Sequence, residues 1–179
     1  MPADLTLLAP AFQDQVRIML DACAQHGYIL RPSEDLRDPY KQAIYWRQSP
    51  SIEQIEQKIA SLEAAQLGFL AHCLRIVGPQ HGPPVTKAIP GLSWHQWGGA
   101  VDCFWLVDGE AIGDLTRKVN GKNGYHVMAE GAQAIGLTSG LYWTQRDAPH
   151  GQIPTSSSIP SDLYSMTDID RLMEERFGE

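Results

Sequence analysis

Several stretches of the chain carry apolar residues at every third or fourth position, the spacing of an amphipathic helix. One stretch runs from Pro10 to Gly27, where the glycine provides a stop. A second, over residues 38–46, has a proline in its first turn. A third begins at the cap residue Ser51 and continues to Val77. The third pattern predicts one long helix.

Two further helices are predicted towards the C-terminus, over residues 124–135 and 167–177. In the second of these, Thr167 and Asp170 have the spacing of a capping pair. Residues 78–91 are dense in proline and glycine, which predicts an irregular loop.

Three stretches favour β-strands, over residues 28–30, 100–107 and 141–143. The first is followed by Arg31-Pro32, which is expected to end it. The second is apolar on both faces, as is typical of a central strand, and Asp108-Gly109 predicts a turn after it. The order of predicted helices and strands indicates a small α+β protein.

The composition is that of a globular protein, with 43% hydrophobic and 20% charged residues. The length predicts a single domain over residues 1–179, with a variable tail and helix over 151–179. Lys and Arg number 14 against 21 Asp and Glu, a net charge of −7, and no basic stripe is interleaved with aromatic residues. Nucleic acid is therefore excluded as an expected partner. The three cysteines lack C-x-x-C spacing and lie among apolar neighbours, which predicts buried, reduced thiols.

Export and membrane signals are not predicted. The first residues include Asp4 and Pro10 and lack both a basic leader and a continuous apolar core, so no signal peptide is expected. A membrane span needs a run of about 18 apolar residues, and the sequence contains none. The protein is expected to be cytoplasmic as synthesised.

Asp102 is the most informative residue of the predicted strand 100–107, because its neighbours on both faces are apolar. A buried carboxylate is costly unless it pairs with a cation or binds a metal. His95 precedes it across the Gly98-Gly99 corner, and His150 lies downstream. Two histidines and one aspartate are a sufficient ligand set for zinc, with a fourth position left for water.

Spacing alone does not decide between a metal site and an ion pair at Asp102. A salt bridge from Asp102 to Arg37 or Arg117 also accounts for the aspartate. His95 is then a loop histidine and His150 a surface one.

Three separated motifs carry a family resemblance. Residues 93–102, SWHQWGGAVD, fit the pattern S-x-H-x-x-G-x-A-x-D, and residues 147–150 fit the pattern D-x-x-H. Residues 37–45 place an arginine before a helix that contains Gln and Tyr. In this order the motifs resemble those of the M15 group of zinc peptidases, which includes D-alanyl-D-alanine carboxypeptidases and the L-alanyl-D-glutamate endopeptidases of phage lysins. The resemblance covers residues 11–152.

The resemblance implies the fold of the D-Ala-D-Ala carboxypeptidase and Hedgehog-like zinc peptidases, an α+β domain with a central antiparallel sheet flanked by helices. It also implies that His95, Asp102 and His150 hold Zn²⁺, and that Asp147 is the catalytic acid and base. This division is chemically reasonable, because zinc lowers the pKa of a bound water towards about 7 and a nearby carboxylate can take its proton.

Four more residues receive roles from the resemblance. Arg37 is expected to bind the scissile carbonyl oxygen and stabilise the oxyanion, the alternative being an ordinary ion pair. Ser93, Gln42 and Trp143 are expected at the substrate-binding surface. A strand aromatic such as Trp143 is otherwise typical of a core.

The implied activity is zinc-dependent hydrolysis of a peptide bond in the peptidoglycan stem, between L-Ala and D-Glu as in phage lysins. The alternatives are a D-Ala-D-Ala carboxypeptidase or dipeptidase, and a non-catalytic module that binds the cell wall. The expected partner is the stem peptide of peptidoglycan. The protein is expected to be a monomer and to act on the cell wall once another protein releases it from the cell.

Overall fold

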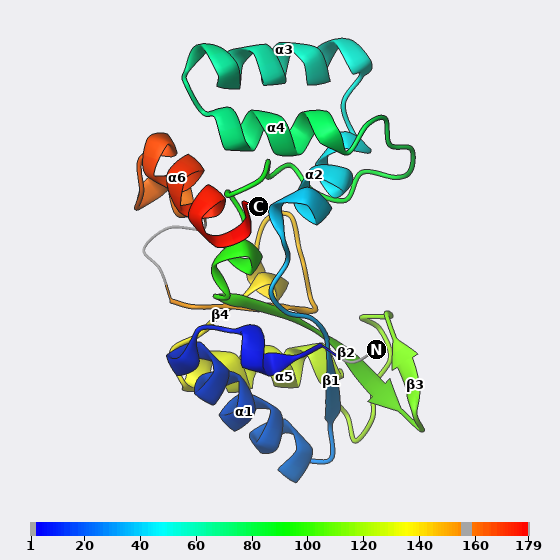
Figure 1. Ribbon diagram of the computed structural model, residues 1–179. Coiled ribbons are helices and arrows are strands. Elements are labelled where there is room, and N and C mark those ends of the chain that lie inside the picture. Colours follow the sequence, from blue (N-terminus) through cyan, green and yellow to red (C-terminus); the bar gives the residue numbers. More distant parts are fainter. Residues whose placement is uncertain (1–2, 155–158, 179) are drawn as a thin grey trace. The chain divides into compact units, whose positions relative to one another are not determined.

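The computed structural model describes residues 3–154 and 159–178, which divide into two compact units. The first unit comprises residues 3–36 and 97–154, and the second comprises residues 37–96 and 159–178. The tail predicted over 151–179 includes residues 155–158 and 179, which lie outside the described residues. Figure 1 labels the helices and strands, and each unit is described by itself below.

The first unit is built on an antiparallel sheet with the order β1-β2-β5-β4, with β3 paired to β2. Its strands are β1 (Ile29–Glu34), β2 (Ala100–Val107), β3 (Glu110–Ile112), β4 (Thr138–Ser139) and β5 (His150–Gln152). Its helices are η1 (Leu5–Leu7), α1 (Pro10–Gln25), α5 (Gly124–Ala134) and η3 (Gly140–Tyr142). The predicted α+β class, with an antiparallel sheet and helices against it, is confirmed.

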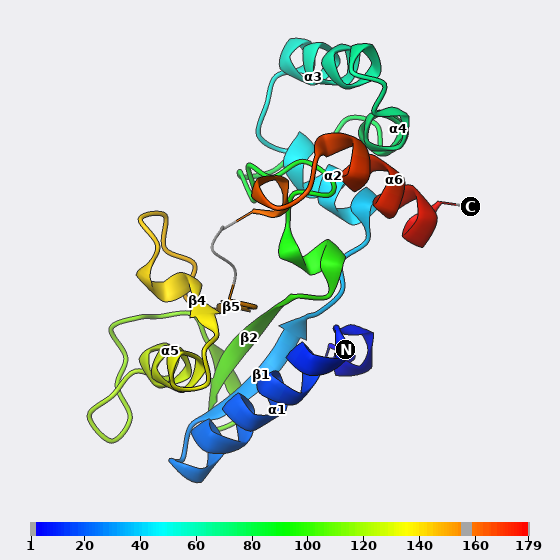
Figure 2. The same cartoon turned by 90° about the vertical axis from the view of Figure 1, so that its left-hand side faces the viewer.

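One face of this sheet is covered by α1 and α5, which lie beside the strands in Figure 2. Alternation along β2 directs Val101, Cys103 and Trp105 into the core between sheet and helices. Phe104 points the other way and is 40% exposed. Strand β2 is central in the sheet, as predicted, but the expectation that both of its faces are closed to water is wrong, and Asp102 shares the more open face.

The three cysteines are free and buried, as predicted. Burial raises the pKa of Cys23 to about 11, and burial, with the charges of Asp170 and Asp38, raises that of Cys73 to about 12. Burial also raises the pKa of Cys103. The thiols therefore stay protonated at neutral pH, and the nucleophilic thiolate is scarce.

We expect the native protein to react negligibly with a thiol-specific disulfide reagent at pH 8, and all three thiols to react after unfolding. Because the folded state holds these protons more tightly, its stability should fall as pH rises from the ordinary thiol pKa of 9.0 towards the raised values of about 11 and 12. Colorimetric thiol titration and thermal unfolding at several pH values check both results. A thiol that reacts rapidly in the native state would contradict them.

Two predicted strands of the first unit are corrected by the structure. The strand expected to end before Arg31 continues to Glu34, because β1 is an edge strand where Pro32 needs no donor on its outer side. Residues 141–143 are not a strand: Gly140–Tyr142 form η3, capped by the Ser139 hydroxyl. The turn at Asp108-Gly109 is confirmed, with both residues at positive φ, and it leads into β3, which the sequence pattern did not indicate.

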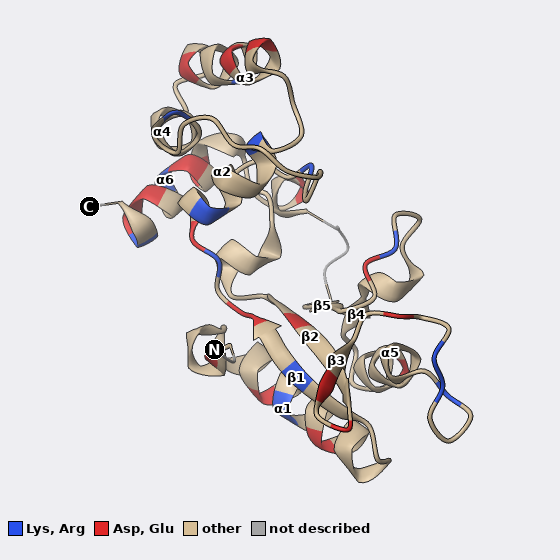
Figure 3. Cartoon of the chain, turned by 90° about the vertical axis from the view of Figure 1, so that its right-hand side faces the viewer, with Lys and Arg blue, Asp and Glu red and all other residues tan. Residues whose placement is uncertain are grey.

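The second unit is helical. It contains α2 (Pro39–Arg47), α3 (Ile52–Ala64), α4 (Gly68–Ile76), η4 (Pro160–Asp162) and α6 (Met166–Phe177), while η2 (Trp94–Trp97) spans the division between the units. Helix α4 packs against α2, α3 and α6. Figure 3 shows many of the acidic residues on α3 and α6. Within the described residues, no helix is both long and apolar enough to cross a membrane.

The long helix predicted from Ser51 to Val77 is in fact two helices, and this expectation is wrong. Gln66 adopts a left-handed conformation with φ 60°, and the Gln66 and Leu67 amides donate to the carbonyls of Glu63 and Leu62. This is a Schellman ending, in which glycine is the usual left-handed residue. The break was missed because glutamine takes that position here.

The predicted capping pair of the last helix is also wrong. Ser165 caps α6 by accepting a hydrogen bond from the Asp168 amide. Asp170 is instead buried and accepts from the Leu70 amide at 2.8 Å, at the start of α4. A carboxylate there complements the positive end of the helix dipole, so Asp170 joins α6 to α4.

Candidate metal centre

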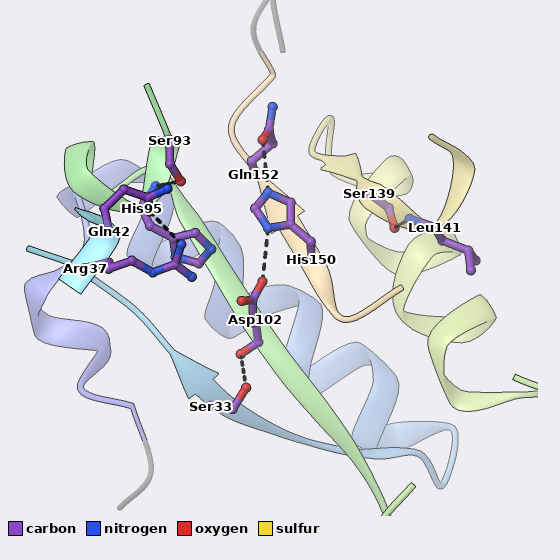
Figure 4. A network of polar contacts seen from close by, with 10 residues as sticks. All are labelled: Ser33, Arg37, Gln42, Ser93, His95, Asp102, Ser139, Leu141, His150 and Gln152. Atoms are coloured by element: carbon purple, nitrogen blue, oxygen red, sulfur yellow. Dashed lines mark hydrogen bonds and ion pairs between the residues drawn. The ribbon is translucent and has the colours of Figure 1, made fainter. Parts of the chain in front are cut away.

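Asp102 and His150 are brought together by strand pairing. Strands β2 and β5 are antiparallel, and their register places the two residues directly opposite each other. Cross-strand neighbours direct their side chains to the same face of the sheet. His150 Nδ1 lies 3.0 Å from Asp102 Oδ1, as Figure 4 shows. The pair is thus set by the backbone of the sheet itself.

The second ring nitrogen of His150 is also engaged. Its Nε2 lies 3.0 Å from Gln152 Oε1, and both side chains are buried. Burial lowers the pKa of His150, but the hydrogen bond and charge of Asp102, with a contribution from Gln152, outweigh it and leave the pKa raised. When Nε2–H donates to the Gln152 amide oxygen, Nδ1 is the nitrogen that can lose its proton and ligate a metal in place of its contact with Asp102.

His95 lies in η2 and is 2% exposed. Its backbone carbonyl accepts a hydrogen bond from the Arg37 amide at 3.2 Å. His95, Asp102 and His150 each offer one ligand atom, and these three atoms lie within 4.8 Å of one another. The structure therefore brings together the three residues that the sequence predicts as metal ligands.

The donor set fits zinc. Two imidazole nitrogens and one carboxylate oxygen are ligands that zinc takes at about 2.0–2.2 Å, usually in a tetrahedron. Two ligands at such distances are about 3.3–3.6 Å apart in a tetrahedron, slightly more than the 3.0 Å between His150 Nδ1 and Asp102 Oδ1. A set of three leaves the fourth position for water or substrate, as in catalytic sites.

Asp147 begins the turn that leads into β5. Its amide donates to the Gly140 carbonyl at 2.9 Å, and its own carbonyl accepts from the His150 amide at 3.2 Å. The side chain is exposed, unlike that of His150. The turn holds the Asp147 carboxylate three residues from a ligand of the candidate metal, and leaves it accessible to water.

Gly140 allows this turn to approach η3. A Cβ on Gly140 would collide with the Asp147 carbonyl oxygen and would lie 3.1 Å from the Cβ of His150. No small shift of a flexible side chain relieves a collision with backbone. The absence of a side chain at position 140 is therefore a requirement of the site.

We expect Gly140→Ala to lower the free energy of unfolding by about 1–3 kcal/mol, the usual cost of overpacking, and to weaken metal binding because His150 is displaced. Urea denaturation and zinc titration measure the two effects. Gly113→Ala is a matched control in the same unit, since nothing lies within 4 Å of a Cβ there. Equal stability of the two variants would contradict the role given to Gly140.

Arg37 is held by a buried amide network in the second unit. Its Nη1 donates to Gln42 Oε1 at 2.9 Å, and its guanidinium carbon lies 5.0 Å from the ring centroid of Tyr45. Gln42 Oε1 also accepts from Gln96 Nε2 at 3.0 Å. The Gln96 oxygen in turn accepts from the amides of Gly91 and Ser93. The orientation of Arg37 and the loop before His95 are thus linked.

The remaining predicted site residues differ in exposure. Gln42 is fully buried and Arg37 is 8% exposed. The Ser93 hydroxyl accepts from the His95 amide at 3.4 Å, so it stabilises the turn that carries His95. Trp143 is half-buried, and its ring centroid lies 5.0 Å from that of His150.

Two residues of the site were not predicted from the sequence. Gln152 lies two residues after His150 on the same strand face, so the period-two pattern offered a signal for it. Gln96 gave no such signal, because a glutamine between a histidine and a tryptophan does not indicate a buried amide.

Of the comparisons with known proteins, the comparison with solved structures finds similar chains. No protein-family model and no curated protein matches the sequence. Among solved structures, the chain is similar to the L-Ala D-Glu endopeptidase ChiX of Serratia marcescens, with 16% identity, a TM-score of 0.47, and coverage of 84% of this chain and 87% of that one. It is also similar to a mutant of the vancomycin resistance D,D-pentapeptidase VanY in complex with Zn(II), with 17% identity, a TM-score of 0.48, and coverage of 94% and 82%. At this level of likeness, the function of the chain rests on its own residues.

Proposed function

We propose that this protein is a zinc peptidase that cleaves the peptidoglycan stem peptide between L-Ala and D-Glu. The observation that carries the proposal is the approach of His95, Asp102 and His150, whose ligand atoms lie within 4.8 Å of one another. An exposed carboxylate, Asp147, stands three residues before one of these ligands. This combination of three metal ligands and a water-accessible acid is the requirement of metal-assisted hydrolysis.

When bound, zinc supplies a Lewis acid that polarises the scissile carbonyl and lowers the pKa of water. Asp147 accepts the proton of the attacking water and returns it to the leaving amine, so that one carboxylate serves as base and then as acid. Arg37 donates to the oxygen that becomes negative in the tetrahedral intermediate. Gln152 holds the His150 ring, and Gln42 holds the Arg37 guanidinium.

Gln42 receives a positioning role in this proposal. A side chain with no exposed surface does not touch the substrate, and its oxygen is bonded to Arg37 and Gln96. Ser93 likewise supports the turn at His95, whereas Trp143 remains a candidate for direct contact with the substrate.

The substrate class follows from the sequence motifs at residues 37–45, 93–102 and 147–150, which resemble those of peptidoglycan peptidases. We propose a monomer that acts on the cell wall after release from the cell that makes it. The net charge of −7 gives no attraction to an anionic wall, so substrate recognition depends on local contacts at the site.

Mass spectrometry of purified peptidoglycan, incubated with the zinc-loaded protein, tests the proposal. New stem fragments with amino-terminal D-Glu are expected. Release of free D-Ala would contradict cleavage between L-Ala and D-Glu and would show that the protein is a carboxypeptidase. No product from the zinc-loaded protein, together with retention on the wall, would contradict catalysis and identify a binding module.

A further inference from the structure

Arg47 is a buried cation outside the candidate metal centre. It ends α2 and is 6% exposed. Its Nη1 donates to the Leu74 carbonyl at 2.5 Å, and its Nε is buried without a hydrogen-bond partner. Within residues 3–154 and 159–178, no carboxylate forms an ion pair with it. Since a guanidinium stays protonated in proteins, the second unit buries a positive charge that no acidic side chain compensates.

The Leu74 carbonyl offsets this charge in part. It lies near the C-terminal end of α4, where the helix dipole favours a cation. One carbonyl, however, accepts from one of the five N–H groups of the guanidinium. A buried guanidinium lowers the stability of the folded state unless its other N–H groups also find hydrogen-bond acceptors.

A hollow of about 290 Å³ lies against Arg47, in the same unit. Its lining includes Gln48, Gln80 and His81, which offer polar side chains, and the first residues of α3, Ser51 and Ile52. None of the described residues that line it is Asp or Glu.

The beginning of α3 adds positive potential to this hollow. The helix has 13 residues, and its N-terminus carries the positive end of the dipole. The amides of Ser51 and Gln54 are already engaged in a capping box, and Glu53 lies in the first turn, so the amides of Ile52 and Glu53 remain as donors. Backbone donors and an arginine at one place are the usual components of a site for carboxylate or phosphate groups.

We propose that this hollow binds a small oxyanion, a carboxylate or phosphate group, with Arg47 as its counter-charge. An oxyanion there accepts hydrogen bonds from the guanidinium and from the start of α3, and supplies the negative charge that no acidic side chain among the described residues provides at Arg47. The site is independent of the proposed peptidase activity, because it uses none of the residues assigned to that activity.

Titration of the full protein with inorganic phosphate, and separately with acetate, at constant ionic strength tests the proposal. The readouts are the amide NMR shifts of Ile52 and Gly82 and the midpoint of thermal unfolding. We expect saturable shifts and a rising midpoint in the wild type. Saturation by phosphate alone identifies a phosphate site, and saturation by both anions identifies a site for carboxylates as well.

Arg47→Met, which removes the charge and keeps the length, should weaken binding about tenfold or more, the worth of a hydrogen bond to a charged group. Arg75→Met is the matched control, because Arg75 is exposed and pairs with Glu63. If Arg47→Met does not fold, Gln48→Glu provides the second test. Its carboxylate should supply the missing charge, raise the midpoint without phosphate and abolish the phosphate response. Equal anion responses in the wild type and in these variants, or no saturable response, would overturn the proposal.

Discussion

Replacing Asp147 with Asn should lower the rate of stem-peptide hydrolysis by about 10²–10⁴-fold, the usual contribution of a general acid and base. Zinc binding should be unchanged, because Asp147 is exposed and stands outside the His95, Asp102 and His150 set. The amide keeps the shape of the side chain and cannot take a proton from water. Kinetics on a soluble stem peptide and zinc content by elemental analysis give the two readouts.

Two control variants make this expectation specific. His150→Ala removes a ligand and should lose zinc and activity together. Asp21→Asn removes an exposed carboxylate from α1 and should change neither. Equal loss of zinc in the Asp147 and His150 variants would show that Asp147 is a ligand and would contradict its assignment as base.

Arg37→Met should lower kcat by about 10²–10³-fold with a much smaller change in KM, as when one oxyanion donor is removed. The reason is that the negative charge on the carbonyl oxygen develops in the transition state, so the contact is stronger there than in the bound substrate. Steady-state kinetics separate the two constants. The methionine side chain still fills the space beside Tyr45, so packing is largely retained.

Arg37→Lys tests whether a positive charge at position 37 is enough to stabilise the oxyanion. Lysine keeps the cation but loses the planar fork, and the hydrogen bond of Arg37 Nη1 to Gln42 is not reproduced in the same geometry. We expect partial recovery of kcat relative to the methionine variant. An unchanged kcat in both variants would remove Arg37 from the mechanism and leave it the structural role.

The helices and strands with a regular spacing of apolar residues were predictable from the sequence. Helix α1 has an uninterrupted pattern, strand β2 is apolar except at Asp102, and the turn at Asp108-Gly109 uses the residues that favour positive φ. The α3 and α4 pair was not predictable, because Gln66 ends α3 where a glycine is the usual signal. Residues 141–143 look like a strand by composition, but the Ser139 cap produces η3 instead.

The candidate site was likewise predictable from the sequence only in part. Asp102 stood out because a carboxylate interrupts an apolar strand, although its face of β2 is more open than the pattern indicated. Its approach to His150 depends on the β2–β5 register, which a single sequence does not reveal for such a short strand. The network of Gln42 and Gln96 around Arg37 depends on tertiary contacts between residues 54 positions apart, so no local pattern indicates it.

Zinc K-edge X-ray absorption of the metal-loaded protein is the most direct test of the proposed metal centre, because it reports the ligand atoms themselves. The His95, Asp102 and His150 site predicts a shell of nitrogen and oxygen at about 2.0–2.2 Å with the multiple scattering of two imidazoles. It predicts no sulfur, since the three cysteines are buried as protonated thiols. A sulfur shell at about 2.3 Å, or an all-oxygen shell without imidazole, would contradict the proposed metal centre.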